Sequence, residues 1–155
     1  MCSREHTNTR TLINMSKIDY KSAGVDIDAG NEAVDRIKDG VKSTFTSNVL
    51  TGLGSFGSLY DLKPILEQYE NPVMVQSIDG VGTKTIIARK LGKFDTIGID
   101  LLSAAANDIL VMGARPLTFL DYIANDRLKP DIIEEIVSGM VKACRDTGVS
   151  LVGGE

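Results

Sequence analysis

The order of apolar and polar residues predicts a chain of short extended segments and amphipathic helices. Apolar residues recur at helical spacing, which predicts helices with one buried face, over Ala33–Val41, Thr83–Leu91 and Lys129–Gly148. Runs of β-branched and aromatic residues predict strands over Pro72–Ile78, Pro116–Ala124 and from Ser150 onward. With 155 residues and a hydrophobic fraction of 43%, the chain is long enough for one domain with a core.

Acidic residues and glycines predict where these helices begin and end. Asp28 is well placed to cap the first helix, and Asp26 is left open for another role because capping needs only one acid. Asp131, with Glu134 three residues later, favours a capped start for the last helix. Gly148 is expected to end that helix.

The apolar segment Pro72–Ile78 stops abruptly at Asp79–Gly82. The helix Thr83–Leu91 follows at once and is expected to end at Gly92. This order predicts a tight turn from a strand into a helix. Such a turn leaves the first N–H groups of the helix pointing outward with partial positive charge, which suits a phosphate.

The residues of this turn suit a nucleotide with a divalent cation. Gly80 and Gly82 can adopt positive φ and let a ligand approach the backbone. Lys84 adds a mobile cation, and Asp79 is a hard oxygen ligand of the kind that magnesium prefers. An ordinary turn with a solvated lysine would use the same residues. The Walker pattern is absent, because Thr83 separates the last glycine from the lysine.

The segment Thr96–Gly113 is apolar nearly all round and is expected to form a buried helix. Asp100, Ser103 and Asn107 share one face of it, and Asp108 lies at the edge of that face. Buried carboxylates need hydrogen bonds, a counter-ion or a metal, and no lysine or arginine lies within one turn. A metal is therefore one interpretation, and helix-surface acids bonded to neighbouring backbone are the other.

The stretch GLGSFG matches G-x-G-x-x-G at Gly52, Gly54 and Gly57. A dinucleotide fingerprint should follow a hydrophobic strand and open a helix, whereas Ser43–Asn48 is polar and Phe56–Leu62 looks like a strand. We therefore reject a Rossmann fold here. Two interpretations stay open: a glycine loop that folds over phosphates and a plain mobile loop.

Charge and cysteine content narrow the possible partners. A net charge of −4 and a pI near 5.0 argue against general attraction to nucleic acid or to an anionic membrane. Cys2 and Cys144 form neither a disulfide framework nor a metal set. The N-terminus lacks the apolar core of a secretory signal, and no apolar run approaches the roughly 20 residues of a membrane span. A cytoplasmic protein is expected. Met15 offers a second plausible start.

Taken in order, several motifs resemble the N-terminal half of the aminoimidazole ribonucleotide synthetase family. The resemblance runs from Tyr20 to Glu155 through YKSAGVDIDAGN, GLGSFG, DGVGTK, DTIGIDL, NDILVMGARP, FLDY and LVGGE. The signature D-x-x-x-x-G-A-x-P of the wider superfamily is present at Asp108, Gly113, Ala114 and Pro116. Members of that superfamily use ATP.

The resemblance implies an ATP-dependent and magnesium-dependent ring closure. Formylglycinamidine ribonucleotide would be converted to aminoimidazole ribonucleotide, ADP and phosphate in purine biosynthesis. By motif, Asp79, Lys84 and Asp108 are the catalytic candidates, and the two aspartates are the expected magnesium ligands. The expected triphosphate cradle consists of Lys84 and the backbone of Gly80, Val81, Gly82 and Thr83.

Further candidates follow from the same resemblance. The loop expected to close over the nucleotide contains Gly54, Ser55, Phe56 and Gly57. Asp26 and Asp28 are expected near the substrate, in an N-terminal segment. Asp100 and Asn107 are second-rank nucleotide-binding candidates, and Glu155 is a third.

For the fold, the resemblance implies an α/β (α+β-like) unit with a mixed, largely antiparallel sheet and helices on one face. That sheet is expected to pair with a second subunit into a barrel, which gives a homodimer. We expect an extension over 1–19, a loop and helix over 20–48 and an ATP-binding domain over 49–155. The family's second domain is absent from this chain, so little or no turnover is expected of it alone.

Other assignments compete with this one. Selenophosphate synthetase would need a reactive cysteine or selenocysteine in the N-terminal loop, and 20–30 has none. A thiamine monophosphate kinase gives no reason for GVDIDAG. A non-catalytic module that binds nucleotide or dimerises is the remaining alternative.

Overall fold

The computed structural model describes residues 20, 24–55 and 57–155. Within them the elements run in the order α1 (Ile27–Lys42), α2 (Lys63–Leu66), α3 (Lys84–Leu91), α4 (Ile97–Leu110), β1 (Thr118–Asp121), α5 (Pro130–Thr147) and β2 (Ser150–Gly154). The extension expected over 1–19 lies outside the described residues. No helix among those described is long and apolar enough to cross a membrane.

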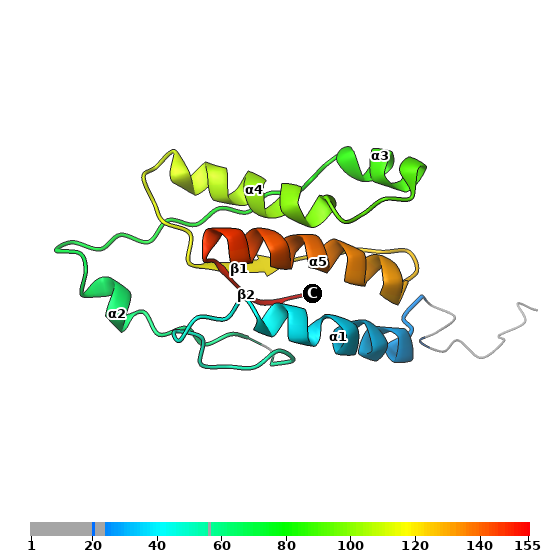
Figure 1. Cartoon of the computed structure of the whole chain (residues 1–155), viewed down its shortest axis with the longest axis horizontal. Helices are drawn as coiled ribbons and strands as arrows, with labels where there is room; N and C mark the ends of the chain where they lie inside the picture. The colour runs from blue at the N-terminus through cyan, green and yellow to red at the C-terminus, as the bar shows by residue number, and fades with distance from the viewer. Residues whose placement is uncertain (1–19, 21–23, 56) are drawn as a thin grey trace, which may run out of the picture.

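Three long helices lie side by side, with α5 between α4 and α1 (Figure 1). The apolar stripe of α5 supplies much of the core, because Val137, Met140, Val141 and Cys144 are all buried. This stripe packs against buried residues of its neighbours, namely Ala33, Val41, Leu102, Val149 and Leu151. The amphipathic pattern therefore predicted the central helix correctly.

Two glycines set the close approach of α4 to α5. A Cβ on Gly98 would overlap the backbone of Ile136 and Met140, and a Cβ on Gly139 would overlap the backbone of Asp95. The backbone of α5 therefore lies against α4 at Gly98, and the backbone of the turn before α4 lies against α5 at Gly139. The carboxylate of Glu135 on α5 also accepts hydrogen bonds from the N–H groups of Phe94 and Asp95 (2.9 and 3.2 Å), which hold the turn before α4.

The sheet corrects one prediction. β1 and β2 pair in parallel, with Thr118 opposite Ser150, and an irregularity in register lies between Phe119 and Leu120. The mixed α/β class is confirmed, but a largely antiparallel sheet was wrong for the strands described. The reason is the connection: α5 carries the chain back across the sheet, and such a crossover makes the two strands parallel. In the described residues, antiparallel pairing is limited to the bridge between Val49 and Tyr60.

The residues just after α1 are fixed to β2 by buried hydroxyl groups. The hydroxyl of Ser150 donates to the carbonyl of Thr44 (3.1 Å) and accepts from the N–H of Thr46 (3.2 Å). The hydroxyl of Thr44 in turn accepts from the N–H of Leu151 (2.9 Å). These bonds join segments that are over 100 residues apart in sequence.

The predicted strand over Pro72–Ile78 is not formed. The segment runs toward α3 outside any sheet, and Val73 and Ile78 are 85% and 98% exposed. An apolar β-branched pattern specifies an extended backbone, but a strand also needs a neighbouring strand to bond with. No such neighbour reaches this segment within the described chain.

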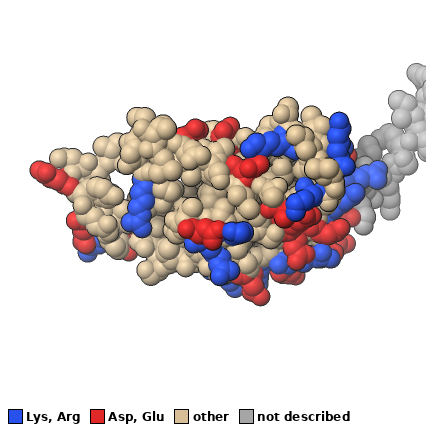
Figure 2. Space-filling model, turned by 45° about the horizontal axis from the view of Figure 1, so that its top comes forward, with Lys and Arg blue, Asp and Glu red and all other residues tan. Residues whose placement is uncertain are grey.

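Uncharged surface and exposed apolar side chains occur at several places on the molecule (Figure 2). Figure 2 shows a broad area without charged side chains on one face, whereas charged side chains gather toward the other end. Large exposed apolar side chains come from the segment before α3 and from the end of α4, among them Met74, Leu110, Val111 and Met112. The prediction of an all-round buried α4 was therefore wrong. The helix buries only the face that meets α5, at Ile97, Gly98 and Leu102.

Two predicted helix caps were also wrong, whereas both glycine stops are confirmed. Asp26, rather than Asp28, caps α1, because its carboxylate accepts a hydrogen bond from the N–H of Ala29 (3.2 Å). The N-cap of α5 is Lys129, because Pro130 occupies the first helical position and moves Asp131 into the first turn. Gly92 and Gly148 end α3 and α5 in the left-handed conformation.

Candidate functional site

The turn before α3 has part of the form that the sequence predicted: a helix follows it, but the strand expected before it is not formed. Asp79, Gly80 and Gly82 are exposed, and α3 begins directly after Thr83. Gly82 has a φ of 54°, which favours glycine, whereas Gly80 does not adopt positive φ. The Asp79 carboxylate accepts a hydrogen bond from the N–H of Gly80 (2.7 Å), so the acid is turned toward the start of the glycine segment.

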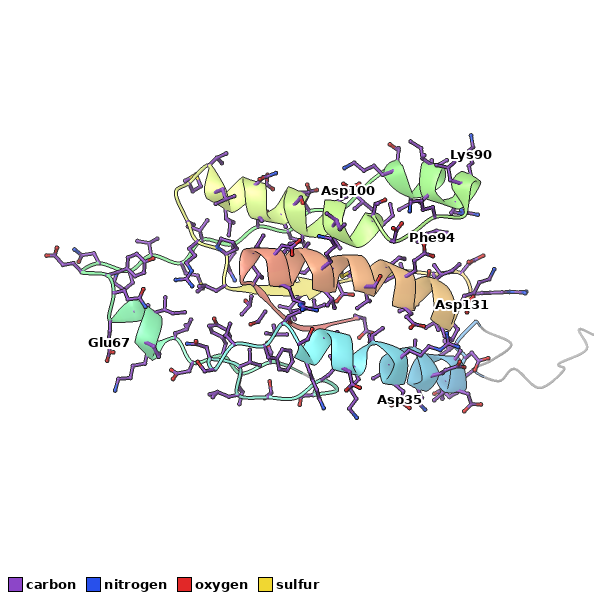
Figure 3. All side chains as sticks on the ribbon, viewed as in Figure 1. Asp35, Glu67, Lys90, Phe94, Asp100 and Asp131 are labelled. Atoms are coloured by element: carbon purple, nitrogen blue, oxygen red, sulfur yellow. The ribbon has the colours of Figure 1, made fainter. Side chains whose placement is uncertain are left out.

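A salt bridge connects this turn to α4. The ammonium group of Lys84 lies 3.3 Å from the carboxylate of Asp100, on the side of α4 that faces α3 (Figure 3). The sequence had offered no basic partner within one turn of Asp100, and the fold supplies one from another helix. Both side chains stay partly solvated, so the pair is available to a ligand.

A hydrogen bond makes a second connection at the other end of the stripe. The hydroxyl of Ser77 donates to the carboxylate of Asp108 (2.9 Å) across 31 residues of sequence. Ser77 stands two residues before Asp79, so this bond fixes the segment just before the turn to the α4 residue that the motif selected. Sequence reasoning did not single out Ser77, since its partner is set only by the fold.

The polar face of α4 is more open than expected. Asp100 is half-buried, and Ser103, Asn107 and Asp108 are exposed. The hydroxyl of Ser103 bonds the carbonyl of Ile99 on its own helix (2.7 Å), as in the interpretation of helix-surface residues. The cost of burying carboxylates therefore gives no argument for a metal here. Support for a metal must come instead from the residues that the fold places together.

The donor set at this place suits magnesium. Within the described residues, no three acidic, histidine or cysteine side chains are grouped so as to hold a metal ion by themselves. Magnesium is usually bound through one or two carboxylates and the phosphates of a nucleotide, with water completing the shell. The carboxylates of Asp79 and Asp108 are hard oxygen donors, and Asp108 is bonded to Ser77, two residues before Asp79, so their chemistry fits that mode.

The glycine stretch forms the loop of a hairpin, which confirms that it is no Rossmann turn. Leu50 donates to Leu59 (2.8 Å) and Asp61 to Asn48 (2.7 Å), so extended segments stand on both sides of the loop. Gly54 has a φ of 97°, in the left-handed region. Phe56 lies outside the described residues.

This loop borders a cavity of about 280 Å³ at the carboxyl ends of β1 and β2. The loop contributes Ser55, Gly57 and Ser58, and the strands contribute Asp121 and Glu155 among others. Sequence reasoning quoted FLDY only as part of a motif and missed Asp121 as a site residue. An acid at the carboxyl end of a predicted strand was the signal that could have identified it.

The two N-terminal acids lie elsewhere. Asp26 caps α1 and Asp28 is exposed in the first turn of that helix. Because α5 lies between α1 and α4, neither acid is brought to the side of the molecule where Lys84 meets Asp100 (Figure 1).

The geometry defines an open polar surface where a glycine turn, a helix start and the polar face of α4 converge. The chain belongs to the family described as AIR synthase related protein, N-terminal domain, which matches residues 63–155. This confirms the resemblance that the sequence motifs indicated.

The curated relatives of this chain have more specific names than the family does. It is 51% identical over 141 residues to the phosphoribosylformylglycinamidine cyclo-ligase of Carboxydothermus hydrogenoformans, covering 91% of this chain and 40% of the relative. The cyclo-ligase of Brevibacillus brevis is 53% identical over 136 residues, covering 88% and 39%. The trifunctional purine biosynthetic protein adenosine-3 of Chironomus tentans is 50% identical over 140 residues, covering 90% and 10%. The chain thus spans about 40% of the length of the cyclo-ligases it matches.

Proposed function

We propose that this chain is the nucleotide-binding part of a phosphoribosylformylglycinamidine cyclo-ligase. The reaction would use ATP to activate an amide oxygen of formylglycinamidine ribonucleotide as a phosphate ester. An internal nitrogen would then attack the activated carbon, close the imidazole ring and release phosphate. The names and the identity of the relatives support this assignment.

One observation carries the proposed site. Two contacts, Lys84 with Asp100 and Ser77 with Asp108, join the DGVGTK turn and the segment just before it to the face of α4 where the superfamily signature begins. Two motifs of separate elements therefore meet on one surface. Phosphoryl transfer depends mainly on positioning and on neutralising charge, and this surface offers backbone N–H groups, an ammonium group and carboxylates.

The residues have separate roles in this proposal. Asp79 and Asp108 would hold Mg²⁺, which supplies charge neutralisation for the phosphates when bound. Lys84 would leave Asp100 to contact the triphosphate, with the backbone of 80–83 beside it. Asn107 would be a neighbouring hydrogen-bonding group on α4. The loop over 54–57 would cover the nucleotide.

We further propose a cytoplasmic homodimer in which the segment Pro72–Ile78 pairs with a second copy. Its exposed apolar residues, such as Val73 and Ile78, lie on an extended backbone without a strand partner. An unpaired extended segment is a template for another strand, and burial in a closed barrel would remove the exposed edge.

Binding of ATP with and without Mg²⁺ tests the site. In the natural protein that contains this chain, Asp79→Asn and Asp108→Asn should each weaken magnesium-dependent ATP binding at least about tenfold, because each removes a charged ligand. Asp131→Asn, an exposed acid at the start of α5 (Figure 3), is the matched control. Unchanged affinity in both site variants, with wild-type folding by circular dichroism, would remove the metal assignment.

A further inference from the structure

The cavity beside the glycine loop has a floor made by β1 and β2. Its walls come from Ser55, Gly57 and Ser58 on one side and from the strand ends on the other. The carboxyl ends of parallel strands are the usual place for ligands in α/β proteins, because the loops that follow leave a crevice there. The volume of about 280 Å³ is enough for part of a nucleotide rather than a whole one.

Asp121 is held in this floor by the neighbouring strand. A Cβ added to Gly154 would overlap the carboxylate of Asp121, so the acid lies directly over the glycine backbone. The backbone of Asp121 is fixed as well, because the carbonyl group of Asp121 accepts a hydrogen bond from the N–H of Glu155 (3.0 Å). The side chain is therefore placed by the sheet.

The environment of this carboxylate is poorly solvated. Burial raises the pKa of Asp121 to about 6. On its inner side lies α5, where burial and the neighbouring Asp121 raise the pKa of the Cys144 thiol to about 12. Such a carboxylate gains more from a hydrogen-bond donor than one in water does.

The charges of the described lining residues disfavour a phosphate. Asp121 and Glu155 are both acidic, Ser55 and Ser58 bring hydroxyls, and neither lysine nor arginine lines the cavity within the described residues. Phosphate would meet repulsion from two carboxylates. A ligand group that donates hydrogen bonds, and is neutral or cationic, is complementary instead.

We propose that Asp121 is a binding residue whose carboxylate accepts hydrogen bonds from a donor-rich, non-phosphate part of a ligand in this cavity. This inference rests on the proposed function and extends its site beyond the phosphate end. Two groups carry the required chemistry there: the vicinal hydroxyls of the ATP ribose and the amidine of formylglycinamidine ribonucleotide.

Calorimetric titration of wild type and Asp121→Asn separates these sources. The amide keeps the shape of the side chain over Gly154 but removes its charge and one acceptor. Three probes are titrated into the natural protein that contains this chain: Mg-ATP, Mg-tripolyphosphate and formylglycinamidine ribonucleotide. Asp35→Asn, an exposed acid on the outer side of α1 (Figure 3), serves as control.

The expected result is an affinity loss of at least about tenfold for one donor-bearing probe, because hydrogen bonds to a charged group are strong. Loss for ATP with unchanged tripolyphosphate binding assigns the cavity to the ribose, and loss for the ribonucleotide assigns it to the amidine. Unchanged affinity for both overturns the inference while leaving the proposed function intact. Equal loss for all three probes also overturns it. A wild-type protein that binds neither ATP nor the ribonucleotide overturns the proposed function itself, and this inference with it.

Discussion

Lys84 and Asp100 join the first turn of α3 to the first turns of α4 through an ammonium–carboxylate distance of 3.3 Å. The two residues are 16 positions apart, and neither has a charged neighbour within a helical turn that could have revealed the contact. A phosphate arriving at the glycine turn would compete with Asp100 for the same ammonium group.

We therefore predict that this salt bridge is weak without nucleotide and is broken by it. A double-mutant cycle with Lys84→Met and Asp100→Asn should give a coupling of about 0.2–1 kcal/mol in the free energy of unfolding, as for other solvated pairs. The coupling should vanish when saturating Mg-ATP is present. A coupling that survives unchanged would show that Lys84 stays with Asp100 and does not serve the phosphates.

Ser77 should act as a positioning residue for Asp108. Removing its hydroxyl in Ser77→Ala frees the carboxylate to rotate, so the Mg²⁺ concentration for half-maximal ATP binding should rise about threefold, as expected for one solvated hydrogen bond. Ser77→Thr keeps the hydroxyl, so its half-maximal Mg²⁺ concentration should equal that of wild type. A magnesium titration at fixed ATP measures the effect, and identical curves for wild type and Ser77→Ala would contradict it.

The stability of the fold should depend on pH through Asp121. Its pKa is raised from 3.8 to about 6, so the folded state holds the proton more tightly than the unfolded state does. The resulting stabilisation is fully present below the unfolded pKa and is lost as pH rises through 6. Across this pH range the free energy of unfolding should fall by about 3 kcal/mol.

Urea unfolding of wild type and Asp121→Asn across this pH range tests whether stability falls as pH rises. The variant cannot titrate at this position, so its free energy of unfolding should be flatter between pH 4 and 6, a window set by the two pKa values. The buried thiol of Cys144 stays neutral throughout, since its pKa is raised to about 12. A wild-type stability that rises with pH relative to the variant would contradict the prediction.

The crossing of α4 and α5 should be intolerant of any side chain at its two glycines. Gly98→Ala forces a methyl group into the backbone of α5, and Gly139→Ala forces one into the backbone of Asp95 just before α4. Each should lower the free energy of unfolding by about 1–3 kcal/mol. Gly30→Ala is the control, because the same methyl group on α1 meets open space and should stabilise by about 0.5–1 kcal/mol. Equal effects at all three positions would refute the close crossing.

A lysine in the exposed extended segment tests the proposed dimer. Ile78 is 98% exposed in the single chain but would be buried against a partner strand. Ile78→Lys should therefore weaken dimerisation at least about tenfold in sedimentation equilibrium, since it buries a charge. Ile27→Lys at the start of α1, also an exposed apolar position, should leave the dimer intact. A monomeric wild type would remove the proposal.

The sequence predicted well whatever depends on local pattern. The stripe of α5 and the stop at Gly148 placed that helix to within a residue at its end, and α3 starts directly after the DGVG turn as predicted. Prediction from the sequence failed where more than one residue could begin or cap a helix. Asp26 and Asp28 can each cap a helix, and Pro130 displaced the cap that Asp131 could have made.

Strand pairing, helix burial and side-chain contacts depend on tertiary structure, so the local sequence pattern could not predict them. An extended apolar run such as Pro72–Ile78 does not specify its strand partner, and α4 looked buried although its end is open. Ser77, and likewise Asp121, gains its role only from a residue that the fold brings beside it. The residues of the candidate site could therefore be named from the sequence, whereas the contacts between them could not.

The buried hydroxyls of Thr44 and Ser150 have a mechanical consequence for the cavity. They tie the root of the glycine hairpin to the first residues of β2, and the hairpin loop and the end of β2 form opposite walls. Both walls of the cavity are therefore anchored at one set of buried hydrogen bonds, made by residues that do not themselves line it.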